Sequence, residues 1–233
     1  MELTEKCKGV IFDLGMTLIY PPLVGRFMER LAEFDVRVDK EELKNAFRFA
    51  DRFMMDNHPG LLNQEVKEFY PFYASLMLSY LHVSQVPVAE FSKNMMEKSP
   101  PRSEWKLYPD TIPCLTELRK RGFKIGVVSN WDLKCRELLE QLELTPYLDY
   151  VVVSSEIGIE KPAPGPFRKC LEGLGITAGE AIYVGDNFRD DIQGANNVGI
   201  KALYLQRKEE NQLATGWDFR QISALNEVFA YIG

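Results

Sequence analysis

The chain has 233 residues, enough for one domain or for one domain with an insertion, and its 45% hydrophobic and 27% charged residues are typical of a globular protein. A formal net charge of -6 argues against nucleic acid or an anionic membrane as the main partner, because both need clustered Lys and Arg. The four cysteines form no C-x-x-C pair, and there is neither a membrane-length apolar run nor a signal peptide, so we expect a cytoplasmic protein with reduced thiols and no zinc site.

The first predicted element is a strand at residues 9–12, followed directly by Asp13-Leu14-Gly15-Met16-Thr17. A short run of consecutive apolar residues closed by Asp and Gly is typical of a strand buried on both faces of a parallel sheet. Asp13 would then stand at the carboxyl end of this strand, the edge at which open α/β sheets bind ligands. Aspartate is also a common turn residue, so this position alone leaves a capping role open.

Residues 23–98 have a helical period and no buried-strand run, which predicts an all-helical insertion. Apolar stripes at helical spacing predict that these helices pack against one another. Pro71 interrupts the third stripe, so we expect a kink or two separate helices there. Pro21-Pro22 and Pro100-Pro101 bracket the insert. They predict a cap-like domain at residues 21–101, inserted into a core domain made of residues 1–20 and 102–233.

After the insert the chain alternates between strand and helix patterns. We predict strands at residues 123–129, 150–154, 181–184 and 201–205, and helices at residues 111–121, 133–142, 166–174, 189–197 and 222–232. Strands joined by single helices of this length require right-handed crossovers and a parallel sheet covered on both faces. The predicted fold class is therefore α/β, a doubly wound parallel sheet with an inserted all-helical domain.

Three later strand ends carry polar residues that parallel pairing would bring toward Asp13. Ser129-Asn130 follows one predicted strand, Lys161-Pro162 follows the next after a loop, and Gly185-Asp186 follows the third. Asp190 and Asp191 open the helix after that. Each of these signals alone is common in turns, whereas all of them in this order predict a single site.

The set formed by residues 13–17, Ser129, Lys161 and residues 185–191 is similar, in this order, to the four signature motifs of the haloacid dehalogenase-like (HAD) hydrolase superfamily. The similarity covers residues 9–18 and roughly residues 106–205, and the helical insert has the position of the type-1 cap of that superfamily. The resemblance implies a Rossmann-like core, a hydrolase of the phosphatase type and Mg²⁺ as cofactor. It also implies a small phosphorylated metabolite as substrate and an aspartyl-phosphate intermediate.

The resemblance further implies a role for each matching residue. Mg²⁺ would be held by Asp13, the backbone carbonyl of Gly15 and Asp186, with Asp191 as the supporting residue of the metal site. Catalysis would use Asp13 as nucleophile, Ser129 to bind a phosphoryl oxygen and Lys161 to hold nucleophile and phosphoryl group together. The residues binding the substrate would be Gly15, Thr17, Ser129, Asn130 and Lys161. Asp190 would either assist or be merely solvated.

One position departs from the pattern of the family. Phosphatases of the family carry a second aspartate two residues after the nucleophile, which protonates the leaving oxygen and later activates water, and here that residue is Gly15. General acid-base catalysis is worth about 10²- to 10⁴-fold, so release of an alcohol should be poor without a substitute. A cap residue, water or a leaving group that needs no acid are the candidates. Trp131, directly after Asn130, either lines the entrance or packs in the core.

Two alternatives stay open. Branches of the superfamily that cleave carbon–halogen or carbon–phosphorus bonds also lack the second aspartate, but the metal carboxylates Asp186 and Asp191 argue against the metal-free dehalogenases. The carbon–phosphorus branch needs a cap lysine that forms an imine, for which the candidates are Lys40, Lys44 and Lys67. The other alternative is a catalytically impaired protein that binds a phosphorylated ligand or a protein partner.

Overall fold

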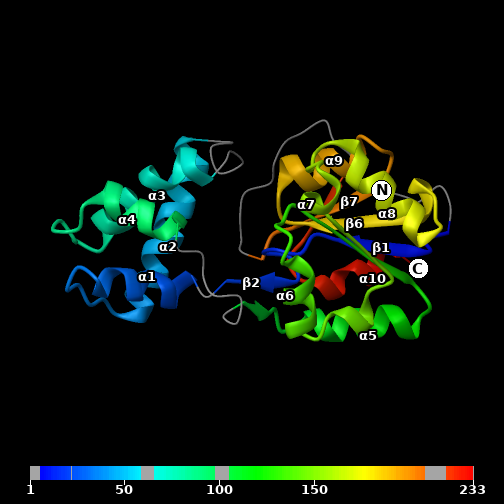
Figure 1. The fold of residues 1–233 in the computed structure, drawn as a ribbon, viewed down its shortest axis with the longest axis horizontal. Coiled ribbons are helices and arrows are strands. Elements are labelled where there is room, and N and C mark those ends of the chain that lie inside the picture. Colours follow the sequence, from blue (N-terminus) through cyan, green and yellow to red (C-terminus); the bar gives the residue numbers. More distant parts are fainter. Residues whose placement is uncertain (1–5, 22, 59–65, 98–104, 208–218, 233) are drawn as a thin grey trace. The chain divides into compact units, whose positions relative to one another are not determined.

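The computed structural model describes residues 6–21, 23–58, 66–97, 105–207 and 219–232 (Figure 1). The chain divides into two compact units, one formed by Met1–Tyr20 with Trp105–Gly233 and the other by Pro21–Glu104. The predicted proline boundaries at Pro22, Pro100 and Pro101 lie outside the described residues. Within the described ranges, no helix combines the length and the apolar character needed to cross a bilayer.

The first unit is built on a six-stranded parallel sheet with the strand order β5-β4-β1-β6-β7-β8. The strands are β1 (Gly9–Phe12), β4 (Lys124–Ser129), β5 (Tyr150–Val153), β6 (Ala181–Gly185), β7 (Lys201–Leu205) and β8 (Phe219–Ile222). The chain adds β4 and β5 on one side of β1 and then crosses over to add β6, β7 and β8 on the other. The predicted doubly wound α/β fold is confirmed, and the reversal of strand order places a crevice at the carboxyl end of β1.

Helices cover both faces of this sheet because alternate residues of the central strands enter two different cores. Val10 and Phe12 pack on the face covered by α5 (Thr111–Lys120), α6 (Cys135–Gln141) and α10 (Phe229–Ile232). Ile11 and Tyr183 pack on the opposite face, which α8 (Pro164–Leu174) and α9 (Gly194–Asn196) cover (Figure 1). A strand apolar on consecutive residues is the pattern that this double burial requires.

The structure departs from the sequence prediction at three short strands. The helix predicted at residues 222–232 is wrong at its start, because Ile222 ends β8 and helical structure follows only in a 3₁₀ turn at Leu225–Val228 and in α10. Arg220 and Gln221 of β8 are exposed, so this edge strand lacks an apolar run. The antiparallel pair of β2 (Ile19–Tyr20) and β3 (Lys106–Leu107) is too short to give a pattern.

In its described residues the second unit has four helices, α1 (Leu23–Ala32), α2 (Lys40–Asn57), α3 (Val66–Tyr80) and α4 (Val88–Glu97). Their apolar faces share one core around Phe27, Leu43 and Phe91, as the stripes predict. The alternative of two helices separated at Pro71 is wrong, since α3 continues through this residue. A proline near the helix start removes only one backbone hydrogen bond, a loss that packing against α2 and α4 outweighs.

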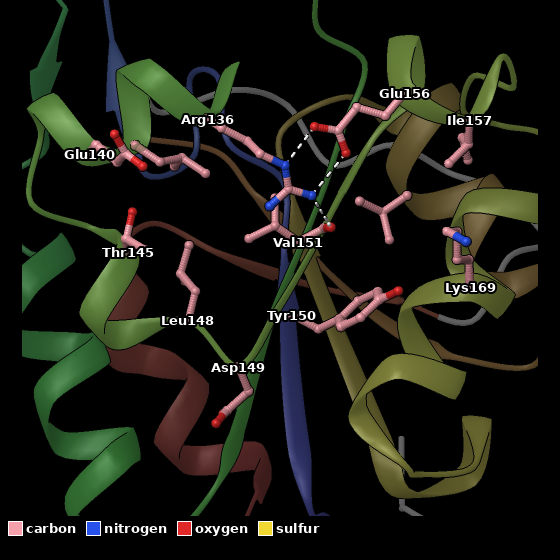
Figure 2. A pocket seen from close by; sticks show the side chains of 12 residues that line it. Arg136, Glu140, Thr145, Leu148, Asp149, Tyr150, Val151, Glu156, Ile157 and Lys169 are labelled. Carbon is pink, nitrogen blue, oxygen red and sulfur yellow. Dashed lines mark hydrogen bonds and ion pairs between the residues drawn. The ribbon is translucent and has the colours of Figure 1, made fainter. Parts of the chain in front are cut away.

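Arg136 closes the exposed edge of the sheet at β5 (Figure 2). Its guanidinium donates to Glu156 of α7 (Ser154–Ile157) at 2.6 and 2.8 Å and to the Val151 carbonyl at 3.2 Å. A hollow of about 290 Å³ lies beside this strand, and none of its lining residues belongs to β1, β4 or β6. We interpret it as part of a charge-protected edge rather than as the ligand crevice.

Gly126 of β4 marks a close approach between the sheet and α8. A Cβ at this position would lie 2.7 Å from Cys170 Sγ and 3.0 Å from Leu174 Cδ1. We therefore expect Gly126→Ala to lower the free energy of unfolding by about 1–3 kcal/mol, because an overpacked core forces side chains to shift. Cys170→Ala removes the nearer atom, so the double variant should be less destabilised than the sum of the two single variants. Urea unfolding of the four proteins measures the coupling, and strict additivity would contradict it.

Candidate active site

The ends of three neighbouring strands meet at the carboxyl end of β1. Phe12 pairs with Val127 of β4 and with Val184 of β6, and the backbone N–H of Asp13 donates to the Val184 carbonyl at 2.9 Å. β4 ends at Ser129, which is buried, and β6 ends at Gly185. Strand register therefore places Asp13 between the residues that follow its two neighbours.

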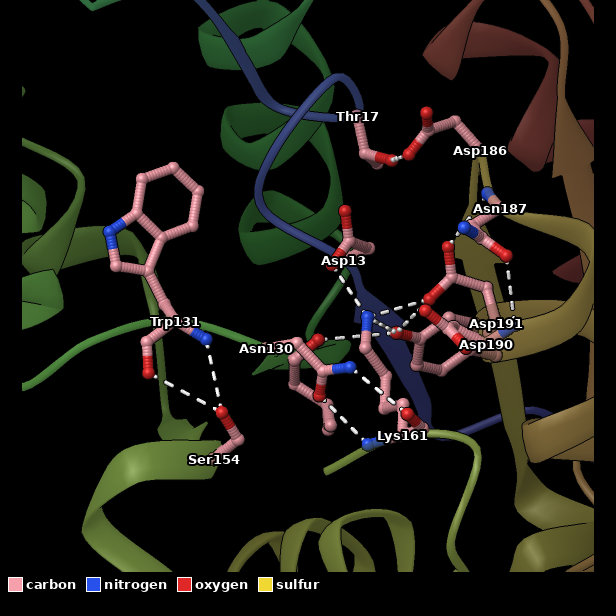
Figure 3. Close-up of polar contacts among 12 residues, drawn as sticks. Asp13, Thr17, Asn130, Trp131, Ser154, Lys161, Asp186, Asn187, Asp190 and Asp191 are labelled. Carbon is pink, nitrogen blue, oxygen red and sulfur yellow. Dashed lines mark hydrogen bonds and ion pairs between the residues drawn. The ribbon is translucent and has the colours of Figure 1, made fainter. Parts of the chain in front are cut away.

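A buried ammonium group lies at the centre of this crevice (Figure 3). Lys161 Nζ is 2.6 Å from Asp13 Oδ1 and 2.6 Å from Asp191 Oδ1, and the three side chains are nearly inaccessible to solvent. Burial by itself would lower the pKa of Lys161, but the two carboxylates raise it above its ordinary value. The lysine is therefore held as a cation that joins β1 to the segment after β6.

Besides Lys161, two further groups fix Asp191. Its Oδ1 accepts from the Tyr183 hydroxyl at 2.9 Å, and its Oδ2 accepts from the backbone N–H of Asn187 at 3.0 Å. A Cβ on Gly185 would lie 2.3 Å from the Asp191 carboxylate, so only glycine allows this approach. The helix predicted at residues 189–197 begins as a π-helical turn, Phe188–Gln193, which turns Asp191 inward.

Asp186 and the loop after Asp13 are connected through Thr17. The Thr17 hydroxyl donates to Asp186 Oδ1 at 3.3 Å (Figure 3), and the Thr17 carbonyl accepts from Arg207 Nη2 at 2.8 Å. Arg207 also pairs with Asp110 at 3.0 Å and lies 3.7 Å from the centre of the Tyr108 ring. Sequence reasoning missed Arg207, because an arginine after the last-predicted strand carries no motif.

Three carboxylates gather close to the ammonium. Oxygen atoms of Asp13, Asp186 and Asp191 lie within 4.8 Å of one another. Burial raises the pKa of Asp13 to about 6, with the Lys161 charge opposing the rise and the Asp191 charge adding to it. Burial and the charges of Asp13 and Asp191 raise the pKa of Asp186 well above its usual value. Three acidic groups around one ammonium leave excess negative charge, so this oxygen donor set could hold a hard divalent cation.

Asn130 holds the segment that carries Lys161. Its side-chain amide donates to the Lys161 carbonyl at 3.0 Å, and its Oδ1 accepts from the Lys161 backbone N–H at 2.8 Å (Figure 3). Both hydrogen bonds go to the backbone, so Asn130 positions the lysine rather than presenting its amide to a ligand. Of the predicted site residues, Asp13, Thr17, Asn130, Lys161, Asp186 and Asp191 thus belong to one hydrogen-bonded crevice, with Ser129 beside it.

Gly15 lies in a tight loop in which the N–H groups of Leu18 and Ile19 both donate to the Leu14 carbonyl, at 2.9 and 3.0 Å. Met16, the next residue, has a φ of 57°, a left-handed conformation that is uncommon for residues other than glycine. The six-membered ring of Trp131 lies against Gly15. Sequence reasoning missed this contact and also missed Tyr183, whose hydroxyl is hidden in an otherwise apolar strand.

Comparison with known proteins identifies relatives along almost the whole chain. A model of the family described as haloacid dehalogenase-like hydrolase matches residues 10–205. A glyceraldehyde 3-phosphate phosphatase of Methanopyrus kandleri is 35% identical over 210 residues, 86% of this chain and 84% of the relative. A ribulose-1,5-bisphosphate 5-phosphatase of Halopiger xanaduensis is 32% identical over 217 residues, 90% of this chain and 89% of the relative. A crystal structure of an HAD phosphatase from Thermococcus onnurineus, 23% identical, shares the fold with a TM-score of 0.59 over 96% of both chains.

The role of Asn130 can be tested with a matched asparagine. We expect Asn130→Ala to lower the free energy of unfolding by about 1–3 kcal/mol, because the backbone N–H and C=O of Lys161 both lose a partner. Asn196→Ala removes one local hydrogen bond, from Asn196 of α9 to the Ile192 carbonyl of the preceding π-helical turn, and should change the free energy of unfolding by about 0.5 kcal/mol or less. Urea titration of both variants makes the comparison. Equal effects would show that Asn130 is an ordinary surface contact.

Proposed function

The chain belongs to the haloacid dehalogenase-like hydrolases, and we propose that it is a Mg²⁺-dependent phosphohydrolase that transfers the phosphoryl group of a small phosphorylated metabolite to Asp13. Four charged side chains carry the proposal: the Lys161 ammonium joins Asp13 to Asp191, with Asp186 within 4.8 Å of both. The two relatives support it, since both are named as phosphatases.

An anionic nucleophile can attack a phosphate only where positive charge separates the two anions. Lys161 supplies one such charge at Asp13, and a hydrogen bond from Ser129 would hold a phosphoryl oxygen at the end of β4. Asp13, Asp186 and the Gly15 carbonyl would hold Mg²⁺, with Asp191 fixing the segment behind them. When bound, the ion would neutralise charge on the phosphoryl oxygens.

Asp13 performs the covalent step of the proposed reaction. One of its carboxylate oxygens forms a bond to phosphorus while the bond from phosphorus to the leaving oxygen breaks, and the electron pair stays on the leaving group. The oxygen of a water molecule then bonds to phosphorus as the bond from phosphorus to Asp13 breaks, which regenerates the Asp13 carboxylate and releases dihydrogen phosphate carrying both protons of the water. Arg207 and Thr17 contribute by holding the loop after Asp13 and the Asp186 carboxylate in place.

The carboxylates proposed to bind or support the metal favour phosphoryl transfer over cleavage of a carbon–halogen or a carbon–phosphorus bond. Dehalogenation by this superfamily needs no metal, whereas the buried Asp191 and the half-buried Asp186 lie beside Asp13 at a cost that a bound cation would offset. Among the lysines considered for an imine, Lys44 is paired with Glu41 at 2.6 Å on the surface of α2, and Lys40 is exposed. The side chain of Lys67 lies outside the described residues.

Replacing the nucleophile should remove the activity. We expect Asp13→Asn to lower kcat for Mg²⁺-dependent phosphate release from acetyl phosphate and 4-nitrophenyl phosphate by about 10³-fold or more, because the amide cannot form the covalent intermediate. Asp35→Asn is the matched control, since Asp35 is exposed in the helical unit and its φ of 59° suits asparagine. Phosphate release that is unchanged in Asp13→Asn would rule out the proposed function.

Mg²⁺ should stabilise the folded protein through the same carboxylates. At a Mg²⁺ concentration a hundred times its Kd, we expect about 2.7 kcal/mol of added stability, visible as a rise in Tm. Asp186→Asn should lose most of this rise, whereas Glu172→Gln, an exposed position in α8, should keep it. Thermal unfolding with and without MgCl₂ gives the readout, and a rise of the same size in Asp186→Asn would place the ion elsewhere.

A further inference from the structure

Trp131 fills the space beside the position where phosphatases of the family carry their second aspartate. A Cβ built on Gly15 would lie 3.1 Å from Cζ3 and 3.9 Å from Cη2 of the Trp131 ring. The first distance is tighter than an ordinary van der Waals contact, so a side chain at position 15 requires the ring to move. The size of the side chain at position 15 is therefore limited by the Trp131 ring.

Neighbouring residues hold both the backbone and the ring of Trp131. Its backbone N–H donates to Ser154 Oγ at 3.1 Å, and its carbonyl accepts from Ser154 Oγ and from the Ser155 N–H, both at 3.3 Å (Figure 3). The Trp105 ring packs edge-on against it, with centroids 4.9 Å apart and an interplanar angle of 67°. Both rings pack at the margin of the core under α5 and α6. The ring therefore contacts Trp105 on one side and Gly15 on the other, from a backbone that Ser154 and Ser155 hold in place.

Three of the donors near Asp13, on Lys161, Thr17 and Tyr183, are committed to neighbours, and Ser129 is assigned above to a phosphoryl oxygen. Lys161 is bound between Asp13 and Asp191, and the Thr17 hydroxyl donates to Asp186. The buried Tyr183 hydroxyl lies 2.9 Å from Asp191 and 3.2 Å from the Val128 carbonyl. Protonating a leaving oxygen would break one of these contacts, each made between buried groups.

We propose that Gly15 and Trp131 form a specificity-determining pair that restricts the enzyme to phosphoryl donors whose leaving group departs as a stable anion, namely acyl and aryl phosphates. This inference rests on the phosphoryl transfer to Asp13 proposed above. When Asp13 attacks an acyl phosphate, the phosphorus–oxygen bond breaks and a carboxylate leaves with the electron pair, needing no proton. An alcohol leaving group would depart as a strongly basic alkoxide, a step that a general acid must assist.

The dependence on the leaving group measures this restriction in the wild-type protein. The probes are acetyl phosphate and a series of aryl phosphates from 4-nitrophenyl phosphate to phenyl phosphate, with Mg²⁺ present. The ratio kcat/KM reports the steps up to phosphorylation of Asp13. We expect it to fall about 10²-fold or more across the aryl series as the basicity of the phenolate rises, which is the size of a missing general acid. A flat series would overturn the inference.

Variants separate the steric role of Trp131 from the chemistry. Gly15→Asp should keep the steep dependence because the ring occupies the space, and Trp131→Ala should keep it because no acid is present. Gly15→Asp combined with Trp131→Ala should flatten the series to within about tenfold, since an acid then has room to act. The Mg²⁺-induced rise in Tm verifies that each variant is folded. A flat series in Gly15→Asp alone, or a steep one in the double variant, would overturn the assignment to Trp131.

Failure of this inference is distinguishable from failure of the proposed function. If Asp13→Asn abolishes turnover of the aryl phosphates but their kcat/KM values are independent of the leaving group, the phosphohydrolase stands and the specificity pair is wrong. If turnover survives in Asp13→Asn, the phosphoryl transfer itself is wrong, whatever the slope.

Discussion

The structure of the crevice depends on one buried ammonium held between two buried carboxylates. Moving charged groups out of water costs free energy. This cost is offset only where each charge has an opposite charge at short distance and its other lone pairs and protons are hydrogen-bonded. Lys161 meets this condition at Asp13 and Asp191, 2.6 Å from each. Asn130 fixes the lysine backbone, and Tyr183 and the Asn187 N–H fix Asp191. Most polar contacts around the site thus serve to keep this charge arrangement in place.

Strand topology explains why these groups can meet although they lie far apart in the sequence. The order of the sheet reverses at β1, so the segments after β4 and β6 flank Asp13 without blocking it. Gly185 lets the Asp191 carboxylate approach the end of β6, and the π-helical turn that follows directs it inward. Arg207 connects the loop after Asp13 to the rest of the core unit. It bridges the Thr17 carbonyl and Asp110, and the Asp110 carboxylate also accepts from the Leu225 N–H.

The sequence predicted those parts of the fold and of the site that depend on one strand or on the residues directly after it. The strands at residues 9–12 and 201–205 have the predicted bounds, and Asp13, Lys161, Asp186 and Asp191 all occur at loops that parallel pairing must bring together. Tyr183 and Arg207 were not predictable, because their roles depend on contacts across the fold and not on local pattern. β8 was missed for a related reason. Its exposed Arg220 and Gln221 interrupt any apolar pattern, so only its pairing with β7 identifies it as an edge strand.

The contact between Gly15 and Trp131 bears on what the substrate requires. Fitting a side chain into a packed site costs about 1–3 kcal/mol of stability, which a protein with the usual 5–15 kcal/mol tolerates. A general acid worth about 10²- to 10⁴-fold lowers the reaction barrier by roughly 2.7–5.4 kcal/mol. Where the leaving group needs a proton, the lowering of the barrier by a general acid therefore exceeds the packing cost. With Trp131 packed against Gly15, this protein lacks that general acid. A tryptophan ring packed against glycine is more favourable than a carboxyl group at position 15 only where the leaving group is stable as an anion. With such a leaving group, the carboxyl group would add strain without lowering the barrier.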